Sequence, residues 1–372
     1  MNDREYMAEA IRLAARGIYT THPNPSVGCV IVRDGEIVGR GWHPRAGAPH
    51  AEVFALEDAG DAARGADVYV TLEPCSHHGR TPPCADGLIR AGVRRVVAAM
   101  QDPNPKVAGQ GLEKLRHAGI EVETGLLADQ AAALNPGFLS RLQRGRPYVR
   151  LKLAASLDGR TAMASGESRW ITGAASRQDV QRLRARSSAV VTGVGTILAD
   201  NPSLNVRLDA GQLHSVDPVR QPLRVVLDSR LRLSPAANIV TLPGGKLVVT
   251  ANADRDAWHP LQAAGAEVVL AGRDASGRLD PAAVLELLAD RDVNEVLLEC
   301  GPTVAGSFMA AGLVDELVLY LAPHLMGDAA RGMFTLPGLE QMQARIALEW
   351  IDVRRIGEDL RITARPNPAT GR

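Results

Sequence analysis

The sequence is poor in aromatic residues and has no excess charge of either sign. Phe, Trp and Tyr make up 3% of its 372 residues, which disfavours the stacking platforms that bind single-stranded nucleic acid. Lys plus Arg equals Asp plus Glu, at 42 each, so no overall positive field attracts a polyanion, although a local basic groove stays possible. We therefore expect no nucleic-acid partner.

Long apolar segments are also missing, and cysteine is scarce. No stretch is long and apolar enough to span a membrane. Charged residues interrupt the first 17 positions, so this segment predicts an amphipathic helix of a folded domain and no signal peptide. The four cysteines are Cys29, Cys75, Cys84 and Cys300. Without an export signal we expect a cytoplasmic protein with no membrane partner, whose thiols are free or metal-bound.

Helix and strand patterns alternate along the chain and break once. In the first half, strands are predicted near 26–32, 36–42, 67–71 and 95–99, and helices from 51, around 88 and from 129 to 144. The segment Arg144-Gly145-Arg146-Pro147 then combines a charged helix end, a glycine and a proline. After it, strands are predicted near 148–154, 189–192, 223–228, 246–250, 267–270, 295–299 and 312–321. The pattern predicts two α/β domains, 1–145 and 146–372, with a frayed tail over 365–372.

The first half carries a pattern of metal-binding residues. His50-Ala51-Glu52 is followed by Pro74-Cys75 and, after eight residues, by Cys84. A zinc deaminase needs three protein ligands, an open position for a water whose pKa the metal lowers, and a carboxylate that moves protons without binding the metal. Alone, a His-x-Glu is usually polar surface and a cysteine pair is often two buried thiols. Together and in this order they favour a zinc deaminase.

Two further features of this region bear on that site. We expect His50 and Cys84 each to begin a helix, where the positive helix ends stabilise thiolates and other anions. His77 and His78 lie in the loop between the cysteines. Because three ligands already fill a catalytic zinc site, these histidines favour loop surface or substrate contact over ligation.

The spacing of the cysteines carries a resemblance to a known family. Many deaminases place two residues between them, whereas this chain has eight, in Cys75-Ser-His-His-Gly-Arg-Thr-Pro-Pro-Cys84. With Thr21-His22-Pro23-Asn24-Pro25-Ser-Val27-Gly28 and Gln101-Asp102-Pro103-Asn104-Pro105, it resembles the bifunctional riboflavin biosynthesis proteins over nearly its whole length. These proteins fuse a diaminohydroxyphosphoribosylaminopyrimidine deaminase to a 5-amino-6-(5-phosphoribosylamino)uracil reductase.

The resemblance implies a cytidine-deaminase-like three-layer domain over 1–145. In such a domain His50, Cys75 and Cys84 would bind one Zn²⁺ per chain, and Glu52 would be the general acid/base. The implied reaction is hydrolytic deamination of 2,5-diamino-6-(5-phosphoribosylamino)pyrimidin-4-one. Asn24 would contact the pyrimidine, since its amide both donates and accepts hydrogen bonds. Without the resemblance, Asn24 reads equally well as a turn residue between prolines.

The second half has a candidate phosphate-binding turn. Gly193-Val-Gly195-Thr196 follows a predicted strand and precedes a predicted helix, so its backbone N–H groups could hold a phosphate. By itself this is weak, because Leu198 stands where a dinucleotide fingerprint has its third glycine. The resemblance implies a dihydrofolate-reductase-like α/β fold, which binds NADPH without that fingerprint and reduces the ribosyl group to a ribityl chain.

Residues of this half match the family's site positions one by one. The implied cofactor positions are Ala154, Trp170, Thr172, Thr196, Asp200, Ser229, Gly301, Pro302 and Thr303. The implied substrate positions are Ser168, Arg184, Leu204, Arg207 and Glu299. Arg184 and Arg207 can grip a phosphate with their planar forks, although a single arginine is by default solvated surface. Asn205 departs from the family, where Thr is expected. Lys152, Asp200 and Glu299 are candidate proton donors for the reduction.

Two other functions remain open from the sequence. One is a nucleic-acid-editing deaminase, which neutral charge and the long cysteine loop disfavour. The other is an active deaminase with a non-catalytic C-terminal binding or dimerisation domain, which the polar residues from Lys152 to Glu299 disfavour. The small-molecule partner implied by the resemblance is a phosphoribosylamino-pyrimidine. The family further implies a homo-oligomer, dimer or tetramer, built through the reductase half.

Overall fold

The computed structural model describes residues 1–76, 83–105, 107–213 and 218–367. The chain divides into two compact units. The first comprises Met1–Gly145 and Asp209–Val219, and the second comprises Arg146–Leu208 and Arg220–Arg372. Both units are α/β, which confirms the predicted fold class.

The first unit is built on a five-stranded sheet in the order β2-β1-β3-β4-β5. Its strands are β1 (Gly28–Arg33), β2 (Glu36–Trp42), β3 (Asp67–Val70), β4 (Arg95–Ala98) and β5 (Glu121–Thr124). β1 pairs antiparallel with β2 and β3, whereas β3, β4 and β5 run parallel.

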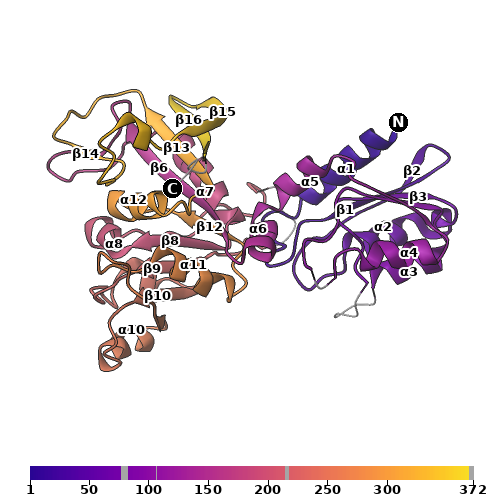
Figure 1. Ribbon diagram of the computed structural model, residues 1–372, viewed down its shortest axis with the longest axis horizontal. Helices are drawn as coiled ribbons and strands as arrows, with labels where there is room; N and C mark the ends of the chain where they lie inside the picture. The colour runs from indigo at the N-terminus through magenta and orange to yellow at the C-terminus, as the bar shows by residue number, and fades with distance from the viewer. Residues whose placement is uncertain (77–82, 106, 214–217, 368–372) are drawn as a thin grey trace. The chain divides into compact units, whose positions relative to one another are not determined.

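Helices cover both faces of this sheet, because its strands alternate their buried side chains between two cores. In β1, Cys29 and Ile31 face one core, and Val30 and Val32 face the other. The helices are α1 (Asp3–Ala15), α2 (Ala51–Ala59), α3 (Cys84–Ala91), α4 (Gln110–His117), α5 (Ala128–Leu134) and α6 (Pro136–Arg144), with a 3₁₀ turn η1 (Gly60–Ala63). Figure 1 shows α1 and α5 on one side of the sheet and α2, α3 and α4 on the other. The arrangement is the expected three-layer domain.

A glycine lets α2 lie directly on β2. A Cβ at Gly41 would come within 2.1 Å of the carbonyl oxygen of Ala51, the first residue of α2. Only a residue without a side chain permits this approach. It fixes the N-terminal turn of α2, which carries His50 and Glu52, against the sheet.

Two sequence predictions for this unit were incomplete. The helix expected from 129 to 144 is two helices, because Pro136 begins α6 and the Asn135 side chain bonds to the backbone of Ser26. The sequence reading also missed α4 and β5. The four residues of β5 are mostly exposed, so they carry no alternating apolar signal.

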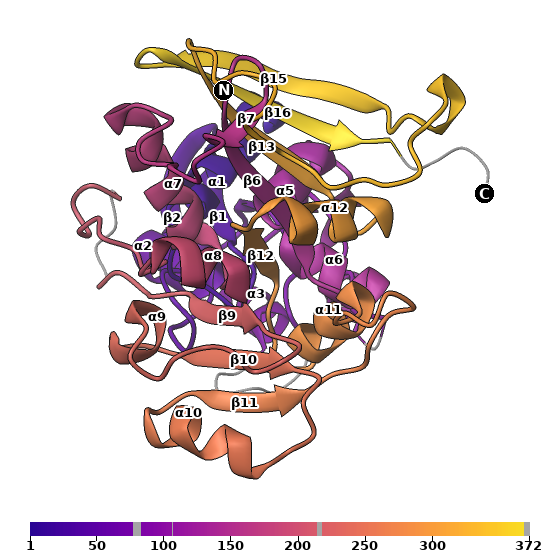
Figure 2. The ribbon, with the colours of Figure 1, turned by 90° about the vertical axis from the view of Figure 1, so that its left-hand side faces the viewer.

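The second unit contains a nine-stranded sheet in the order β11-β10-β9-β8-β12-β6-β13-β16-β15. Its strands are β6 (Tyr148–Ser156), β8 (Ala189–Gly193), β9 (Leu223–Leu227), β10 (Lys246–Thr250), β11 (Glu267–Leu270), β12 (Glu295–Leu298), β13 (Glu316–Ala322), β15 (Leu348–Ile356) and β16 (Asp359–Pro366). From β11 to β13 the strands are parallel, and β16 and β15 add an antiparallel hairpin. A small separate sheet pairs β7 (Arg160–Ala162) with β14 (Arg331–Gly332). Figure 2 shows the large sheet from β15 at one end to β11 at the other.

Helices pack on both faces of the large sheet, over two separate apolar cores. They are α7 (Ala174–Arg186), α8 (Val194–Asp200), α9 (Asn238–Thr241), α10 (His259–Ala263), α11 (Pro281–Ala289) and α12 (Pro302–Ala310), with 3₁₀ turns η2 (Asp256–Trp258) and η3 (Met342–Ala344). α11 and α12 contribute to one core, and α7 to α10 contribute to the other. No helix in the described ranges is long and apolar enough to cross a bilayer.

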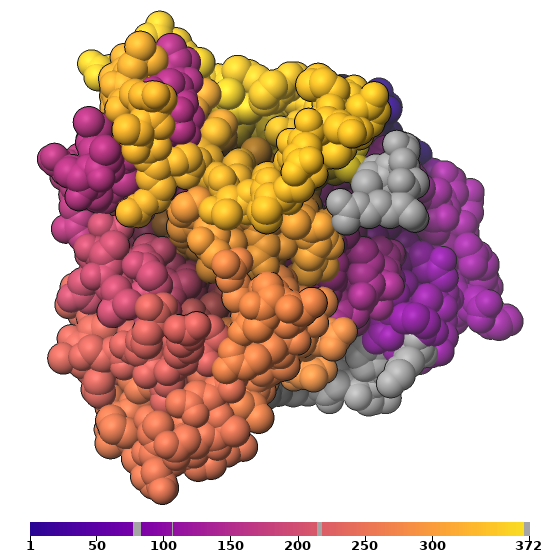
Figure 3. All heavy atoms as spheres, turned by 60° about the vertical axis from the view of Figure 1, so that its left-hand side comes forward, coloured from indigo at the N-terminus to yellow at the C-terminus, as the bar shows by residue number. Residues whose placement is uncertain are grey.

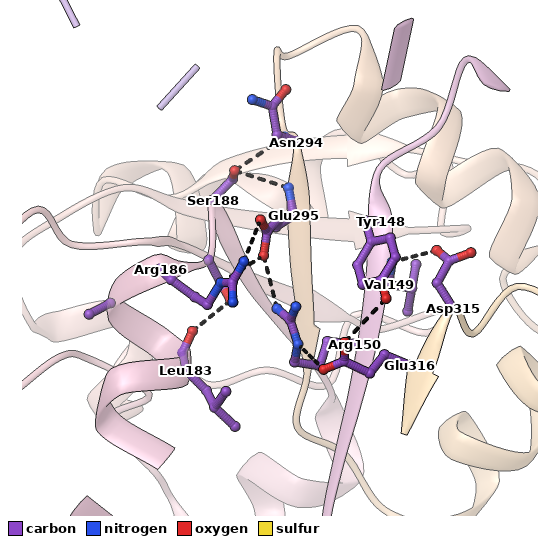
Figure 4. Close-up of polar contacts among 12 residues, drawn as sticks. Tyr148, Val149, Arg150, Leu183, Arg186, Ser188, Asn294, Glu295, Asp315 and Glu316 are labelled. Atoms are coloured by element: carbon purple, nitrogen blue, oxygen red, sulfur yellow. Dashed lines mark hydrogen bonds and ion pairs between the residues drawn. The ribbon is translucent and has the colours of Figure 1, made fainter. Parts of the chain in front are cut away.

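A buried charge network lies at the amino ends of these parallel strands. Arg150 in β6 pairs with Glu295 at the start of β12, at 2.9 Å, and with Glu316 at the start of β13, at 2.5 Å. Arg186 makes a second ion pair with Glu295 (Figure 4). Ligands of parallel sheets bind at the opposite, carboxyl edge, so this network serves the fold.

The C-terminal hairpin was not predicted. β15 is exposed along almost its whole length and lacks an apolar face that alternates with a polar one. The expected frayed tail was also wrong at its start, because Arg365 and Pro366 belong to β16. The final five residues lie outside the described part of the chain.

Candidate active sites

Three predicted ligand atoms meet in the first unit. His50 is the N-cap of α2 and Cys84 is the first residue of α3, as expected. The Nδ1 atom of His50 lies 3.6 Å from the Cys75 sulfur and 3.4 Å from the Cys84 sulfur, and all three atoms lie within 4.8 Å of one another. Usual Zn–N and Zn–S bonds at tetrahedral angles place N and S about 3.5 Å apart. This donor set therefore fits one Zn²⁺.

The surroundings of Cys75 favour its thiolate. Hydrogen bonds from the Cys84 side chain and then from His50, together with the backbone N–H of Cys84 at 3.3 Å from the sulfur, lower the pKa of Cys75 to about 4. The hydrogen bond with Cys75 in turn raises the pKa of His50. A thiolate on Cys75 is the form that binds a metal ion.

Glu52 lies in the first turn of α2, two residues beyond His50, and its side chain is buried. Burial raises the pKa of Glu52 to about 7, although the charge of His50 opposes the shift. A carboxyl group with a pKa near neutrality can both accept and release a proton at physiological pH. The structure thus places a buried carboxyl that titrates near neutrality beside the three ligand atoms.

Asn24 is connected to this cluster through His43, which the sequence reading did not identify. The Nδ1 atom of His43 lies 3.0 Å from the carbonyl oxygen of Pro49, so it must carry the hydrogen. Its Nε2 atom is then the acceptor for the Asn24 amide nitrogen, at 3.1 Å. The His43 ring meets the His50 ring edge to face, at 5.5 Å between centroids. Burial lowers the pKa of His43, which keeps its ring neutral.

In the second unit, two predicted substrate residues bind each other. The Arg184 guanidinium, on α7, and the Glu299 carboxylate, just after β12, form a two-pronged ion pair of 2.6 and 2.9 Å. Half-buried Lys152 in β6 belongs to the same group: burial lowers its pKa, and the Glu299 charge partly opposes this. Burial alone would raise the pKa of Glu299, but Arg184 and then Lys152 hold it below its usual value.

The segment after β7 meets the end of α8. The hydroxyl of Ser168 lies 3.1 Å from an Asp200 carboxylate oxygen, and Arg169 bonds to the Asp200 carbonyl oxygen. Trp170 is 70% exposed, with the Arg177 guanidinium 4.5 Å from its ring centre. Arg177 also donates to the carbonyl oxygen of buried Thr172.

Two predicted cofactor loops face each other at the carboxyl edge of the sheet. A Cβ at Gly301 would lie 3.8 Å from the Thr196 hydroxyl, and one at Gly193 would come within 2.8 Å of Val304. Nothing lies within 4 Å of a Cβ at Gly195, so the backbone there is open. Pro302 and Thr303 begin α12 behind Gly301. Ala154 and Ser229 lie on the same edge, near the end of β6 and just after β9.

The Leu204–Arg207 segment is attached to Arg184. Leu204 is buried, and the carbonyl oxygen of Asn205 accepts a hydrogen bond from Arg184 at 3.2 Å. Arg207 is exposed, and its guanidinium lies 3.4 Å from the Asn205 side-chain oxygen. Asn205, the one departure from the family pattern, thus touches a predicted substrate arginine.

Comparison with known proteins matches both halves. Residues 147–362 match the RibD C-terminal domain, and residues 1–100 match the cytidine and deoxycytidylate deaminase zinc-binding region. The riboflavin biosynthesis protein RibD of Escherichia coli is 53% identical over 97% of this chain and 98% of its own length. The chain belongs to the RibD family.

Solved structures of RibD proteins agree in fold. RibD of Acinetobacter baumannii is 47% identical and superposes with a TM-score of 0.90 over 98% of this chain and 99% of its own. A deaminase/reductase from Thermotoga maritima is 34% identical, with a TM-score of 0.84 over 98% of both chains. As a RibD protein, the chain is a bifunctional deaminase and reductase of riboflavin biosynthesis, with a zinc-binding deaminase domain and a reductase domain that uses a nicotinamide cofactor.

The RibD deaminase site includes one more residue that the sequence reading missed. Buried Glu73, two residues before Cys75, accepts backbone hydrogen bonds from Asp102, Gly109, Gly111 and Leu112. It ties the segment from Asp102 to Leu112 to the residues that lead into Cys75. The only sequence signal was an acidic residue directly before Pro74-Cys75. His77 and His78 lie outside the described residues.

Proposed function

We propose that the first unit deaminates 2,5-diamino-6-(5-phosphoribosylamino)pyrimidin-4-one and that the second reduces the ribosyl group of the product with NADPH. The observation that carries this proposal is the grouping of His50, Cys75 and Cys84 around a buried Glu52 whose pKa is about 7. The Thermotoga relative, named for these deaminase and reductase activities, supports it.

In the deaminase, His50, Cys75 and Cys84 would hold one Zn²⁺ per chain, which would supply an activated water. Glu52 would take up a proton and later deliver it to the leaving amine, because its pKa suits both roles. Asn24 orients the pyrimidine. The amide nitrogen of Asn24 donates a hydrogen bond to His43. The amide oxygen of Asn24 has no partner among the described residues, so this oxygen is available to accept a hydrogen bond from a ring N–H of the substrate.

In the reductase, the chain would orient the substrate and supply a proton, and the bound nicotinamide would supply the hydride. The Gly193–Thr196 turn and the Gly301–Thr303 loop would hold the cofactor phosphates, and Ala154, Trp170, Thr172, Asp200 and Ser229 would contact the rest of the nucleotide. Ser168 and Leu204 line the substrate, and exposed Arg207 binds its phosphate.

Among the three candidate proton donors, Lys152 suits the reduction best. Burial lowers its pKa, which makes its ammonium group a stronger acid. Glu299 is kept ionised by Arg184 and Lys152, so it holds no proton to give. Asp200 is engaged with Ser168. We infer that Glu299 orients Lys152 and the substrate.

We further propose a cytoplasmic homo-oligomer that assembles through the reductase half. β15 is the last strand of the large sheet, and Trp350, Ile351 and Val353 on it are 63%, 48% and 56% exposed. Exposed apolar side chains on an edge strand are typical of a surface that another chain covers. Light scattering of the full chain and of Trp350→Lys tests this, since the variant should lower the assembly state.

A coupled assay tests the activities. Full-length zinc-loaded protein is given the diaminopyrimidine substrate, and ammonia release and NADPH oxidation are followed together. We expect ammonia in both the presence and the absence of NADPH, and oxidation of NADPH only after deamination or with the deaminated pyrimidine supplied. Ammonia without any oxidation would favour a non-catalytic C-terminal domain. Absence of both ammonia release and NADPH oxidation would refute the proposal.

A further inference from the structure

A segment of the second unit without helix or strand presents Arg207 to solvent. Residues 201–208 have no regular secondary structure, and Leu204, Val206 and Leu208 are buried. Arg207 lies between two of these buried residues and is exposed. In an extended chain, alternate side chains point to opposite sides, so the Arg207 side chain points away from the core. Figure 3 shows this part of the chain, in pink, at the surface of the second unit.

A glutamine side chain binds the main chain of Val206 as a neighbouring strand would. The Oε1 atom of Gln221, just before β9, accepts the N–H of Val206 at 2.9 Å, and its Nε2 atom donates to the Val206 carbonyl oxygen at 3.0 Å. One amide thus satisfies both main-chain groups of one residue. Gln221 is exposed, so water can replace its amide, and we expect the fold to tolerate its removal.

Helix α7 holds the residues on either side of Val206. The Oε1 atom of buried Gln181 accepts the N–H of Arg207 at 2.9 Å. Arg184, one turn further along the same face of α7, donates to the carbonyl oxygen of Asn205 at 3.2 Å. Side chains therefore bind the main chain of three consecutive residues, and the main chain that carries Arg207 is fixed before any ligand arrives.

A fixed main chain lowers the cost of binding a ligand with Arg207. An exposed arginine loses side-chain entropy when it grips a phosphate, and a mobile loop beneath it would add the entropy of ordering its main chain. Every hydrogen bond of Gln181 and Gln221 within the described chain goes to main-chain atoms of Val206 or Arg207. The two glutamines therefore act on a ligand through the position of Arg207.

We propose that Gln221 and Gln181 are positioning residues of the reductase, which hold Arg207 where it meets the phosphate of the pyrimidine substrate. The proposal rests on the proposed reductase function, and it adds two residues that were not among the predicted site positions. The glutamines set the affinity for a phosphorylated substrate and leave the hydride transfer itself unchanged.

Steady-state kinetics of the full-length zinc-loaded protein, with the deaminated pyrimidine at saturating NADPH, tests the proposal. We expect Gln221→Ala to raise the KM about 3- to 10-fold, equivalent to one lost hydrogen bond, and to change kcat less than about twofold. Gln221→Met, which keeps the side-chain length without the hydrogen bonds, should behave alike. Gln178→Ala, at an exposed glutamine of α7 with no side-chain hydrogen bond in the described chain, is the control. An unchanged KM, or a kcat that falls as much as the KM rises, would overturn the proposal.

A double-mutant cycle shows whether the glutamines act through Arg207. In an Arg207→Ala background, Gln221→Ala should raise the KM by less than about twofold further, because the arginine that it positions is gone. Gln181→Ala should show the same dependence on Arg207. An equal rise of the KM in both backgrounds would show that the glutamines act independently of Arg207, and it would overturn the proposal.

Calorimetry with ribose 5-phosphate and with ribose separates this proposal from the reductase assignment, because neither measurement needs hydride transfer. We expect the wild type to bind ribose 5-phosphate more tightly, and Gln221→Ala to weaken the binding of this ligand alone, by about 3- to 10-fold. If no NADPH is oxidised but the phosphate preference depends on Gln221 and Arg207, the reductase assignment fails and the positioning role stands. If NADPH is oxidised and the preference depends on neither residue, the reductase assignment stands and the positioning role is overturned.

Discussion

Arg184 and Glu299 form a two-pronged ion pair in which each side chain is only 10% exposed. The sequence assigned both residues to substrate, with Arg184 as a phosphate ligand. In the structure the fork of Arg184 faces Glu299 and the carbonyl oxygen of Asn205. Three of its five N–H donors are thus committed within the protein, so we expect exposed Arg207 to be the main ligand of the substrate phosphate.

Arg184→Ala should therefore act mainly on the fold and on Glu299. Removing one partner of a buried pair leaves an uncompensated charge, and we expect a loss of about 3–5 kcal/mol in the stability of the second unit. Thermal unfolding followed with and without NADPH measures it. The pKa of Glu299 would rise in the variant. A variant as stable as the wild type would mean that Lys152 alone compensates Glu299.

Arg207→Ala should instead leave stability within about 0.5 kcal/mol, because the side chain is exposed. The KM of the reductase for the deaminated pyrimidine should rise by a factor equivalent to about 1.5–3 kcal/mol, typical of hydrogen bonds to a charged group. Steady-state kinetics at saturating NADPH measures it. Unchanged kinetics would place the substrate phosphate elsewhere.

Glu52→Gln keeps the size of the side chain and removes the group that titrates. We expect zinc to be retained and the rate of ammonia release to fall by about two to four powers of ten. NADPH oxidation with the deaminated pyrimidine should continue at the wild-type rate. Near-normal ammonia release would show that another group moves the protons.

Zinc removal should separate the two activities. Elemental analysis should give one zinc per chain, since the described residues contain one cluster with suitable ligand spacing. Dialysis against a chelator should abolish ammonia release and leave NADPH oxidation intact, and added Zn²⁺ should restore ammonia release. Cys75→Ser should also abolish ammonia release, and added Zn²⁺ should not restore it. Active deaminase without zinc would contradict the assignment of His50, Cys75 and Cys84.

Arg150→Met should destabilise the second unit, by about 3–5 kcal/mol, without a direct effect on either reaction. Burial would raise the pKa of Glu295, but Arg186 and Arg150 hold it below its usual value. This contribution to stability is present above the pKa of Glu295 in the unfolded chain and is lost as pH falls through its folded value. The variant should therefore lose less stability than the wild type on acidification. Parallel unfolding curves at pH 7 and pH 4 compare the two.

The sequence by itself determined the residues around the zinc site. His50 and Glu52 are two positions apart at a helix start, and Cys84 begins another helix, so local backbone geometry already limits where these groups point. Strands with alternating or continuous apolar residues also gave the two α/β domains. β15 carries no such pattern, because it is exposed along most of its length and takes its place in the sheet by pairing with β16.

Only the tertiary structure decided the partners of the charged groups. Arg184 and Glu299 are 115 residues apart, and Arg150 and Glu295 are 145 residues apart. Arg184 and Arg207 were both predicted to contact the substrate, yet Arg184 is buried and Arg207 is exposed. Composition and spacing assign a charge to a position, but the direction of a long side chain depends on which strand ends lie beside it. The order of strands in the sheet, which is set by long-range pairing, therefore determines which charged side chains come close enough to form ion pairs.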